Sequence, residues 1–268
     1  MGQRTSYQPG TFSYVELATP DPEAAKVFYG ELFGWEADDQ PIPEEVGGGV
    51  YTTMRRAGDA VAGLSAQQPD QRAAGVPPNW LSYVTVTDAD ASADRARDLG
   101  GQVLAGPFDV MAVGRMAVIA DPAGAVFALW QAGDSIGATR VNDPGCLTSN
   151  ELSTNDVPGA IAFYSGLFGW QVAEVDTGGA PRYWLINHGG AAEGRNGGMR
   201  ELAPEQAGAS PNWMPYFTVT SADGTIAGAT ELGGGLVAGP TDIPAGRFAV
   251  LQDPQGAIFA VFQGAVDD

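Results

Sequence analysis

Hydrophobic and polar positions along the chain show two periodicities in turn, one typical of strands and one typical of helices. The segment FSYVELATPD at 12–21 predicts a strand, and apolar residues recur at helical spacing from 24 to 33. Pro22 fits the first turn of that helix and Gly34 fits its end. A second strand-to-helix step occurs at WLSYVTVTDADASADRARDLGG. Further strands are predicted within 49–65, 102–110, 115–122 and 125–131. The pattern is therefore strand, helix and three strands, written twice.

The whole pattern returns in the second half of the chain. YVELATPDPEAAKVFYGELFGW at 14–35 matches SNELSTNDVPGAIAFYSGLFGW at 149–170, and PPNWLSYVTVTDAD matches SPNWMPYFTVTSAD. The closing segments AGPFDVMAVGRMAVIADPAGAVFALWQAG and AGPTDIPAGRFAVLQDPQGAIFAVFQG also match. We predict two domains at 9–133 and 144–265, joined by a connection containing Gly and Pro. Each is expected to be an α+β domain in which two βαβββ modules form an incomplete β-barrel with outer helices.

Composition narrows the classes of partner. Lys and Arg total 13 against 32 Asp and Glu among 268 residues, which gives a net charge of −19. Such a charge repels nucleic acid and anionic membrane surfaces. The lone Cys146 excludes an internal disulfide and is expected to be buried. No apolar run is long enough to cross a membrane, so we expect a cytoplasmic protein. We expect it to be a monomer or a homodimer.

The repeated motifs FYxxLFGW and DPxGAxFAxxQ carry a family resemblance. With the paired βαβββ modules, they make the chain similar to the vicinal oxygen chelate superfamily, which includes glyoxalase I, bleomycin-resistance proteins and extradiol dioxygenases. The resemblance covers both halves. It extends to two-domain glyoxalase-like proteins, some of them labelled hydroxylases, that accompany aromatic-polyketide antibiotic pathways.

The resemblance implies three metal-ligand positions in each domain, on the first, fifth and eighth strands. The residues at these positions are Tyr14, Leu81 and Ala128 in the first half and Ser149, Met214 and Ala260 in the second. Neither set supplies the imidazole and carboxylate donors that Zn²⁺ or Fe²⁺ requires. The only histidine, His188, has no first-half counterpart and is expected at a strand end. We therefore expect no metal, no other cofactor, and neither glyoxalase nor dioxygenase activity of the metal-dependent kind.

Strand alternation predicts which side chains line the barrels. The expected ligand-binding residues are Phe12, Tyr14, Leu81, Tyr83, Ala128 and Trp130 in the first half and Ser149, Met214, Tyr216 and Phe262 in the second. They give an apolar, aromatic surface that suits a ring-shaped organic ligand. A packed barrel interior without a pocket would have the same composition.

One carboxylate and one phenol per copy are the candidates for chemistry. Glu16 and Glu151 could act as general bases with raised pKa values, with Tyr83 and Tyr216 as acids. The alternative is structural, because Arg115 and Arg247 also repeat and could form buried ion pairs with the glutamates.

Three functions remain open from the sequence. The first is a metal-free protein that binds a small planar aromatic metabolite, an antibiotic or its biosynthetic intermediate, for sequestration, resistance or pathway assistance. The second is a cofactor-free lyase, isomerase or hydroxylase-type tailoring enzyme that uses the cavity Glu and Tyr residues. The third is a non-catalytic interaction protein whose repeated domains build a pseudo-symmetric body.

Overall fold

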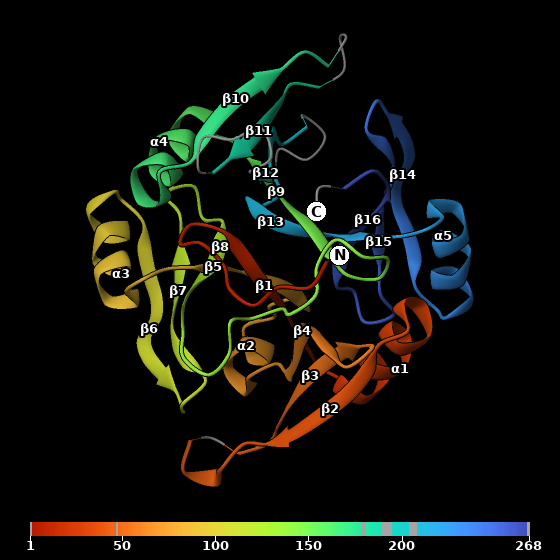
Figure 1. Ribbon diagram of the computed structural model, residues 1–268, viewed down its shortest axis with the longest axis horizontal. Coiled ribbons are helices and arrows are strands. Elements are labelled where there is room, and N and C mark those ends of the chain that lie inside the picture. The colour runs from red at the N-terminus through yellow and green to blue at the C-terminus, as the bar shows by residue number, and fades with distance from the viewer. Residues whose placement is uncertain (1, 47, 178–180, 189–194, 204–207, 267–268) are drawn as a thin grey trace.

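The computed structural model describes residues 2–46, 48–177, 181–188, 195–203 and 208–266 (Figure 1). The first half contains β1 (Phe12–Thr19), α1 (Pro22–Phe33), β2 (Glu36–Pro41), the 3-10 helix η1 (Glu44–Val46), β3 (Val50–Arg56), β4 (Asp59–Ala66), α2 (Pro69–Ala73), β5 (Asn79–Thr85), α3 (Ala89–Asp98), β6 (Gln102–Val110), β7 (Gly114–Ala120) and β8 (Val126–Ala132). The second half contains β9 (Leu147–Thr154), α4 (Val157–Phe168), β10 (Gln171–Val175), β11 (Tyr183–Asn187), β12 (Arg195–Glu201), β13 (Asn212–Thr218), α5 (Ala222–Glu231), β14 (Gly235–Ile243), β15 (Gly246–Gln252) and β16 (Ile258–Gly264).

Each half forms one eight-stranded mixed sheet from its own strands. The strand order is β2-β3-β4-β1-β5-β8-β7-β6 in the first sheet and β10-β11-β12-β9-β13-β16-β15-β14 in the second. Strands β1 and β5 pair antiparallel at the centre and join the two βαβββ modules of the first half, as β9 and β13 do in the second. The sheets stay open at their outer strands. The predicted α+β architecture of tandem incomplete barrels is therefore confirmed.

The repeated helix signals act as the sequence predicts. The Asp21 side chain accepts a hydrogen bond from a backbone N–H in the first turn of α1, and Pro22 follows it. Gly34 ends α1 in the left-handed conformation, with φ of 70°, which a residue without a side chain adopts at little cost. Asp156 and Gly169 do the same for α4.

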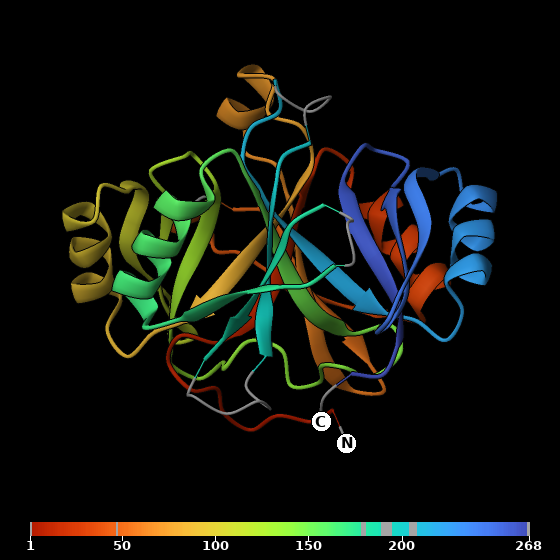
Figure 2. The same ribbon diagram turned by 90° about the horizontal axis from the view of Figure 1, so that it is seen from above.

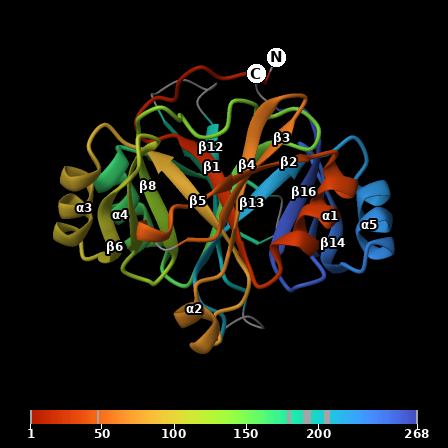
Figure 3. The same cartoon turned by 90° about the horizontal axis from the view of Figure 1, so that it is seen from below.

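Helices of the two halves pack against each other in pairs, α1 with α5 and α3 with α4. Figures 2 and 3 show α1 and α5 together at one end of the molecule and α3 and α4 together at the other. Each pair covers a hydrophobic core to which both halves contribute. The α1/α5 core includes Phe28, Tyr29, Phe33, Trp35, Trp80, Phe217, Leu251 and Phe259. The α3/α4 core includes Phe12, Phe127, Leu129, Phe163, Tyr164, Trp170 and Trp213. Neither half therefore completes a core of its own.

The two motifs that repeat most clearly in the sequence meet across this junction. The Tyr29 hydroxyl of α1 lies 3.0 Å from the Asp253 carboxylate of the second-half DPxG turn. The Tyr164 hydroxyl of α4 lies 3.0 Å from Asp121 in the first-half turn. Each aspartate also accepts backbone N–H groups of its own turn, so its position is fixed from both sides.

The tryptophans of the FGW motif hold the same junction. The Trp35 indole N–H donates to the Gly145 carbonyl oxygen at 2.7 Å, and the Trp170 indole donates to that of Gly10 at 2.7 Å. Both rings are at most 5% exposed. Cys146 lies in the α1/α5 core, as expected, and burial raises the pKa of its thiol to about 12. Among the described residues, no helix is long and apolar enough to span a bilayer.

Candidate functional site

The concave face of the first sheet carries a polar group that we call the first carboxylate cluster, made of Tyr14, Glu16, Tyr51, Ser65 and Tyr83. The Glu16 carboxylate accepts hydrogen bonds from the Tyr83 hydroxyl at 2.9 Å, Ser65 at 2.9 Å and Tyr51 at 3.3 Å. The Tyr51 hydroxyl also lies 3.4 Å from that of Tyr14. The partners of Glu16 are thus neutral hydroxyl groups from β3, β4 and β5.

The second sheet carries the corresponding second carboxylate cluster, made of Ser149, Glu151, Tyr183, Arg200 and Tyr216. The Arg200 guanidinium donates to the Glu151 carboxylate at 3.0 Å. The hydroxyl groups of Tyr216 and Tyr183 lie near this carboxylate and act to lower its pKa. Glu151 is 7% exposed. The second carboxylate therefore has a cationic partner, which the first one lacks among its hydrogen-bond donors.

Strand registers show that the two clusters are equivalent position by position. Glu16 lies opposite Gly63 and Leu81, as Glu151 lies opposite Gly198 and Met214. The remaining equivalences are Tyr14 with Ser149, Tyr51 with Tyr183, Ser65 with Arg200, Tyr83 with Tyr216 and Ala128 with Ala260. The glutamate and two phenols are repeated, and the residues beside them differ.

Burial dominates the electrostatics of both clusters. It raises the pKa of Glu16 above the ordinary value, although hydrogen bonds from Ser65, Tyr83 and Tyr51 oppose the rise. Burial also raises the pKa of Glu151, and the Arg200 charge opposes it. The Tyr83 and Tyr216 phenols have pKa values well above 10, first because of burial and then because of the adjacent glutamate. The phenols remain protonated hydrogen-bond donors at neutral pH, and burial makes each carboxyl easier to protonate than an exposed one.

Two glycines make room for phenols that the sequence reasoning missed. A side chain at Gly63 would overlap the Tyr51 hydroxyl, and one at Gly198 would overlap that of Tyr183. Tyr51 and Tyr183 each lie two strands away from the glutamate in their sheet. The available signal was that both the glycine and the tyrosine occur in both halves at matching places.

An apolar wall adjoins each carboxylate cluster. The first wall comprises Tyr83, Ala128 and Trp130, with Tyr14, Leu81, Val110, Val113 and Met116 packed against them. The second comprises Met214, Tyr216 and Ala260, with Phe248, Val250 and Phe262 packed against them. The structure thus brings together nine of the expected ligand-binding residues, five in the first half and, with Ser149 through its register with Tyr216, four in the second.

Phe12 does not lie with them. The pairing of β1 with β5 shifts register between Phe12 and Tyr14, which breaks the alternation that placed Phe12 on the concave face. Its ring packs instead in the α3/α4 core, with centroids 5.4 Å from Trp170 and 4.9 Å from Trp213. The expectation that Phe12 faces the cavity is therefore wrong.

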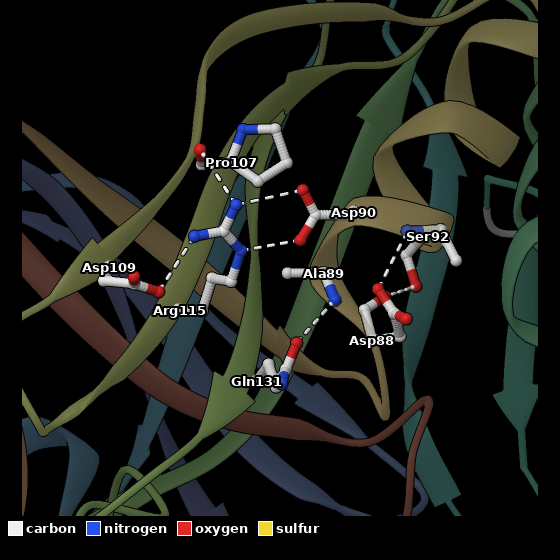
Figure 4. Close-up of polar contacts among 9 residues, drawn as sticks. Asp88, Ala89, Asp90, Ser92, Pro107, Asp109, Arg115 and Gln131 are labelled. Carbon is white, nitrogen blue, oxygen red and sulfur yellow. Dashed lines mark hydrogen bonds and ion pairs between the residues drawn. The ribbon is translucent and has the colours of Figure 1, made fainter.

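The buried pairs expected between the glutamates and Arg115 or Arg247 are also absent from the described contacts of these residues. Figure 4 shows Arg115 binding Asp90 at the start of α3 and Asp109 on β6. Arg247 binds Asp223 and Asp242 in the same way. These arginines tie a helix to the edge of each sheet. The ion pair that the described residues do form with a cluster glutamate, Arg200 with Glu151, was not anticipated.

Two family models match the chain. A model described as the glyoxalase/bleomycin resistance protein/dioxygenase superfamily matches residues 11–129, and one described as a glyoxalase-like domain matches residues 150–262. The protein named "Putative glyoxylase CFP32" from Mycobacterium tuberculosis is 44% identical over 266 residues, covering 99% of both chains.

The chain belongs to the glyoxalase/bleomycin resistance protein/dioxygenase superfamily. Another member of similar length, the anthracycline biosynthesis protein DauV of a Streptomyces species, is 37% identical over 97% of this chain and 95% of its own. Among solved structures, the Mn(II)-bound glyoxalase of Novosphingobium aromaticivorans superposes with a TM-score of 0.64 at 16% identity, covering 97% of this chain and 84% of that one. That likeness shows a common fold.

The superfamily's metal positions do not fit a metal in this chain. Leu81, Ala128, Met214 and Ala260 offer no oxygen or nitrogen donor in their side chains. Among the residues that the structure describes, no three His, Cys, Asp or Glu side chains converge to form a metal-binding group. His188 lies apart from both clusters, with its imidazole against Gly10. No catalytic step can therefore be assigned to a superfamily-type metal ion here.

Two surface hollows lie away from the clusters. One, of about 280 Å³, is lined by residues that include Gly10, Asp88, Arg95 and Phe168, between α3 and the end of α4. The other, of about 390 Å³, is lined by Val157, Pro158, Ile161, Arg182, Trp184 and Glu201. Neither contains a cluster residue. The clusters are better candidates for a site than these two hollows, because they combine repeated carboxylates and phenols with an aromatic wall.

Proposed function

We propose that the protein binds small planar aromatic metabolites on its concave faces, and so serves to sequester such a compound or to assist the pathway that makes it. The observation that supports this most is the pairing of a buried carboxylate–phenol cluster with an apolar aromatic wall, at the place where superfamily relatives hold a metal. Ring-shaped ligands suit such a surface because their faces contact the wall while a few polar groups fix their orientation.

The chemistry of the clusters indicates what a ligand would offer. Each glutamate accepts hydrogen bonds, and each phenol both donates and accepts, so hydroxyl and carbonyl groups on a ring would find partners. Contacts with the aromatic wall could add about 0.5–1.5 kcal/mol per ring pair beyond surface burial. The 37% identical relative is named for anthracycline biosynthesis, which supports an aromatic polyketide as the ligand class.

Equilibrium titration would test this proposal. We expect an anthracycline aglycone to quench the tryptophan fluorescence of the purified protein saturably, and a non-aromatic compound of similar size to leave it unchanged. Mass spectrometry of the protein as isolated should detect a bound aromatic compound if the natural ligand is abundant in the host. Absence of binding by a panel of planar aromatic compounds would contradict the proposal.

A second candidate is a lyase, isomerase or hydroxylase-type tailoring enzyme that needs no cofactor. It is favoured by the 2.9 Å hydrogen bond between the Tyr83 hydroxyl and the Glu16 carboxylate, with burial raising the pKa of both groups. In such an enzyme the glutamate would take a proton from carbon, and the phenol would turn its hydrogen bond from the glutamate to the substrate oxygen that gains charge. Turnover should disappear in the Glu16→Gln, Glu151→Gln double variant while the variant still unfolds in one cooperative transition. Retained turnover would exclude this mechanism.

A further inference from the structure

The two concave faces differ at the position of Tyr14, whose side chain covers part of the first face. In the first, Tyr14 places its own phenol over the cluster: its hydroxyl lies 3.4 Å from that of Tyr51, and its ring centroid lies 5.9 Å from that of Tyr83 at an interplanar angle of 72°. In the second, the equivalent residue is Ser149. No phenol is supplied there by β9, although both partners of such a phenol, Tyr183 and Tyr216, are present.

Two of the wall residues around Ser149 are less covered than their first-half counterparts. Tyr216 is 9% exposed whereas its counterpart Tyr83 is 4% exposed. Trp130, which is 7% exposed, is replaced by the smaller Phe262, which is half-buried. The carboxylates show the opposite trend, because Glu151 is 7% exposed and Glu16 is half-buried. The greater exposure of the second face is therefore confined to Tyr216 and Phe262, whereas Met214 is more buried than its counterpart Leu81.

We infer that the second concave face is the ligand site, that it takes a neutral phenolic ring in the place where the first face has the phenol of Tyr14, and that Tyr14 closes the first face. The inference rests on the proposed function and specifies its site and ligand class. The ligand's hydroxyl would lie against Tyr183, and its ring would lie edge-on to Tyr216, as Tyr14 does to Tyr51 and Tyr83.

Arg200 explains why the ring should be uncharged. It stands where the first half has Ser65, and it forms an ion pair with Glu151. The two charges of the pair offset each other, so the second face offers hydrogen-bonding groups to a neutral phenol and no unpaired charge to attract an ionised ring. Ser149 and Arg200 are thus the specificity-determining differences between the faces.

Isothermal titration with 2-naphthol at pH 7, against 2-methoxynaphthalene as the matched ligand without a hydroxyl donor, tests the inference. We expect the wild type to bind 2-naphthol in a single event and the methoxy compound at least about tenfold more weakly. Ser149→Tyr should weaken 2-naphthol binding at least about tenfold, because the new ring fills the site. Tyr14→Ser should add a second binding event by opening the first face.

Two further variants serve as a replacement for Ser149→Tyr and as a negative control for the binding measurement. Phe262→Trp restores the first-half wall residue and should also weaken binding, so it replaces Ser149→Tyr if circular dichroism shows that variant to be unfolded. Arg182→Val changes the separate hollow beside Trp184 to the first-half residue and should leave binding unchanged.

The possible failures are distinguishable. If neither 2-naphthol nor any other planar aromatic compound binds the wild type, the proposed function is wrong and the inference falls with it. Binding to the wild type in two equal events, or binding that Ser149→Tyr and Phe262→Trp leave unchanged, would overturn the inference while the proposed function stands. A Tyr14→Ser variant that still shows a single event would overturn the claim that Tyr14 closes the first face.

Discussion

The junction between the two halves and the concave faces each occur twice in this chain, and the junction keeps its tryptophans and its Tyr–Asp pairs in both copies, whereas the concave faces differ beside their glutamates. Across the junction the repeated pairs are Tyr29 with Tyr164, Trp35 with Trp170, Trp80 with Trp213 and Asp121 with Asp253. On the concave faces the glutamate and two phenols repeat. Four other positions differ, since the second half has Ser149, Arg200, Met214 and Phe262 where the first half has Tyr14, Ser65, Leu81 and Trp130.

The difference follows from what each residue contacts. A junction residue such as Tyr29 binds the opposite half, so a change there disturbs a core to which both halves contribute. A concave-face residue such as Tyr14 contacts mainly its own sheet, so it can change in one copy while the other copy keeps its packing. The junction therefore maintains the fold, and the concave faces are where the two halves can acquire different binding properties.

The largest effect is expected from Trp170→Ala at the junction. Removing the indole empties part of the α3/α4 core and leaves the Gly10 carbonyl without that donor, so we expect a loss of about 3–5 kcal/mol in the free energy of unfolding. Urea denaturation followed by circular dichroism and fluorescence should show one cooperative transition at a lower midpoint. Trp130→Phe, which copies the second-half wall residue, is the control and should cost much less. A loss below about 1 kcal/mol for Trp170→Ala would contradict the assigned role of the junction.

The sequence predicts the features of this comparison that depend on local spacing. The repeat itself, the caps at Asp21 and Gly34, and the concave placement of Glu16 and Tyr83 all follow from the motifs and the alternation of a single strand. These signals need no knowledge of which strands pair.

Features that depend on pairing between distant strands were not predictable in this way. Phe12 turns into the core because β1 shifts register against β5, and a strand's own sequence does not reveal such a shift. Arg200 reaches Glu151 because β12 lies beside β9, although 49 positions separate them. The composition of each shared core likewise depends on how the two halves pack, which no segment encodes alone.

An intermediate effect is expected from Arg200→Ser, which gives the second cluster the polar partner of the first. The buried Glu151 carboxylate would lose its cation, so we expect a loss of about 1–3 kcal/mol at pH 7, moderated because the Arg200 side chain is 29% exposed. The loss should shrink toward acid pH, where a protonated Glu151 no longer needs the cation. Adding Glu151→Gln should recover most of the stability, and a double variant as unstable as the single one would show that Arg200 acts through packing instead.

The smallest effect, and the sharpest test of the first cluster, is expected from Glu16→Gln. Burial raises the pKa of Glu16 in the folded protein, so its stabilising contribution is fully present below its unfolded value near 4.5 and is lost as pH rises through the folded value. The glutamine stays neutral in both states and still accepts from Tyr83. The variant should therefore gain stability relative to the wild type as pH increases above about 4.5, with each tenfold difference in proton affinity worth about 1.4 kcal/mol.

Denaturation midpoints of both proteins between pH 4 and pH 8 would measure this difference directly, since other titrating groups cancel in the comparison. Glu36→Gln, at an exposed position on β2, is the matched control and should follow the wild type across the range. A Glu16→Gln variant that instead loses stability with rising pH would mean that the ionised carboxylate is the form the hydroxyl groups of Tyr51, Ser65 and Tyr83 favour. In that case the first cluster would hold a fixed negative charge and could not act as a poised proton acceptor.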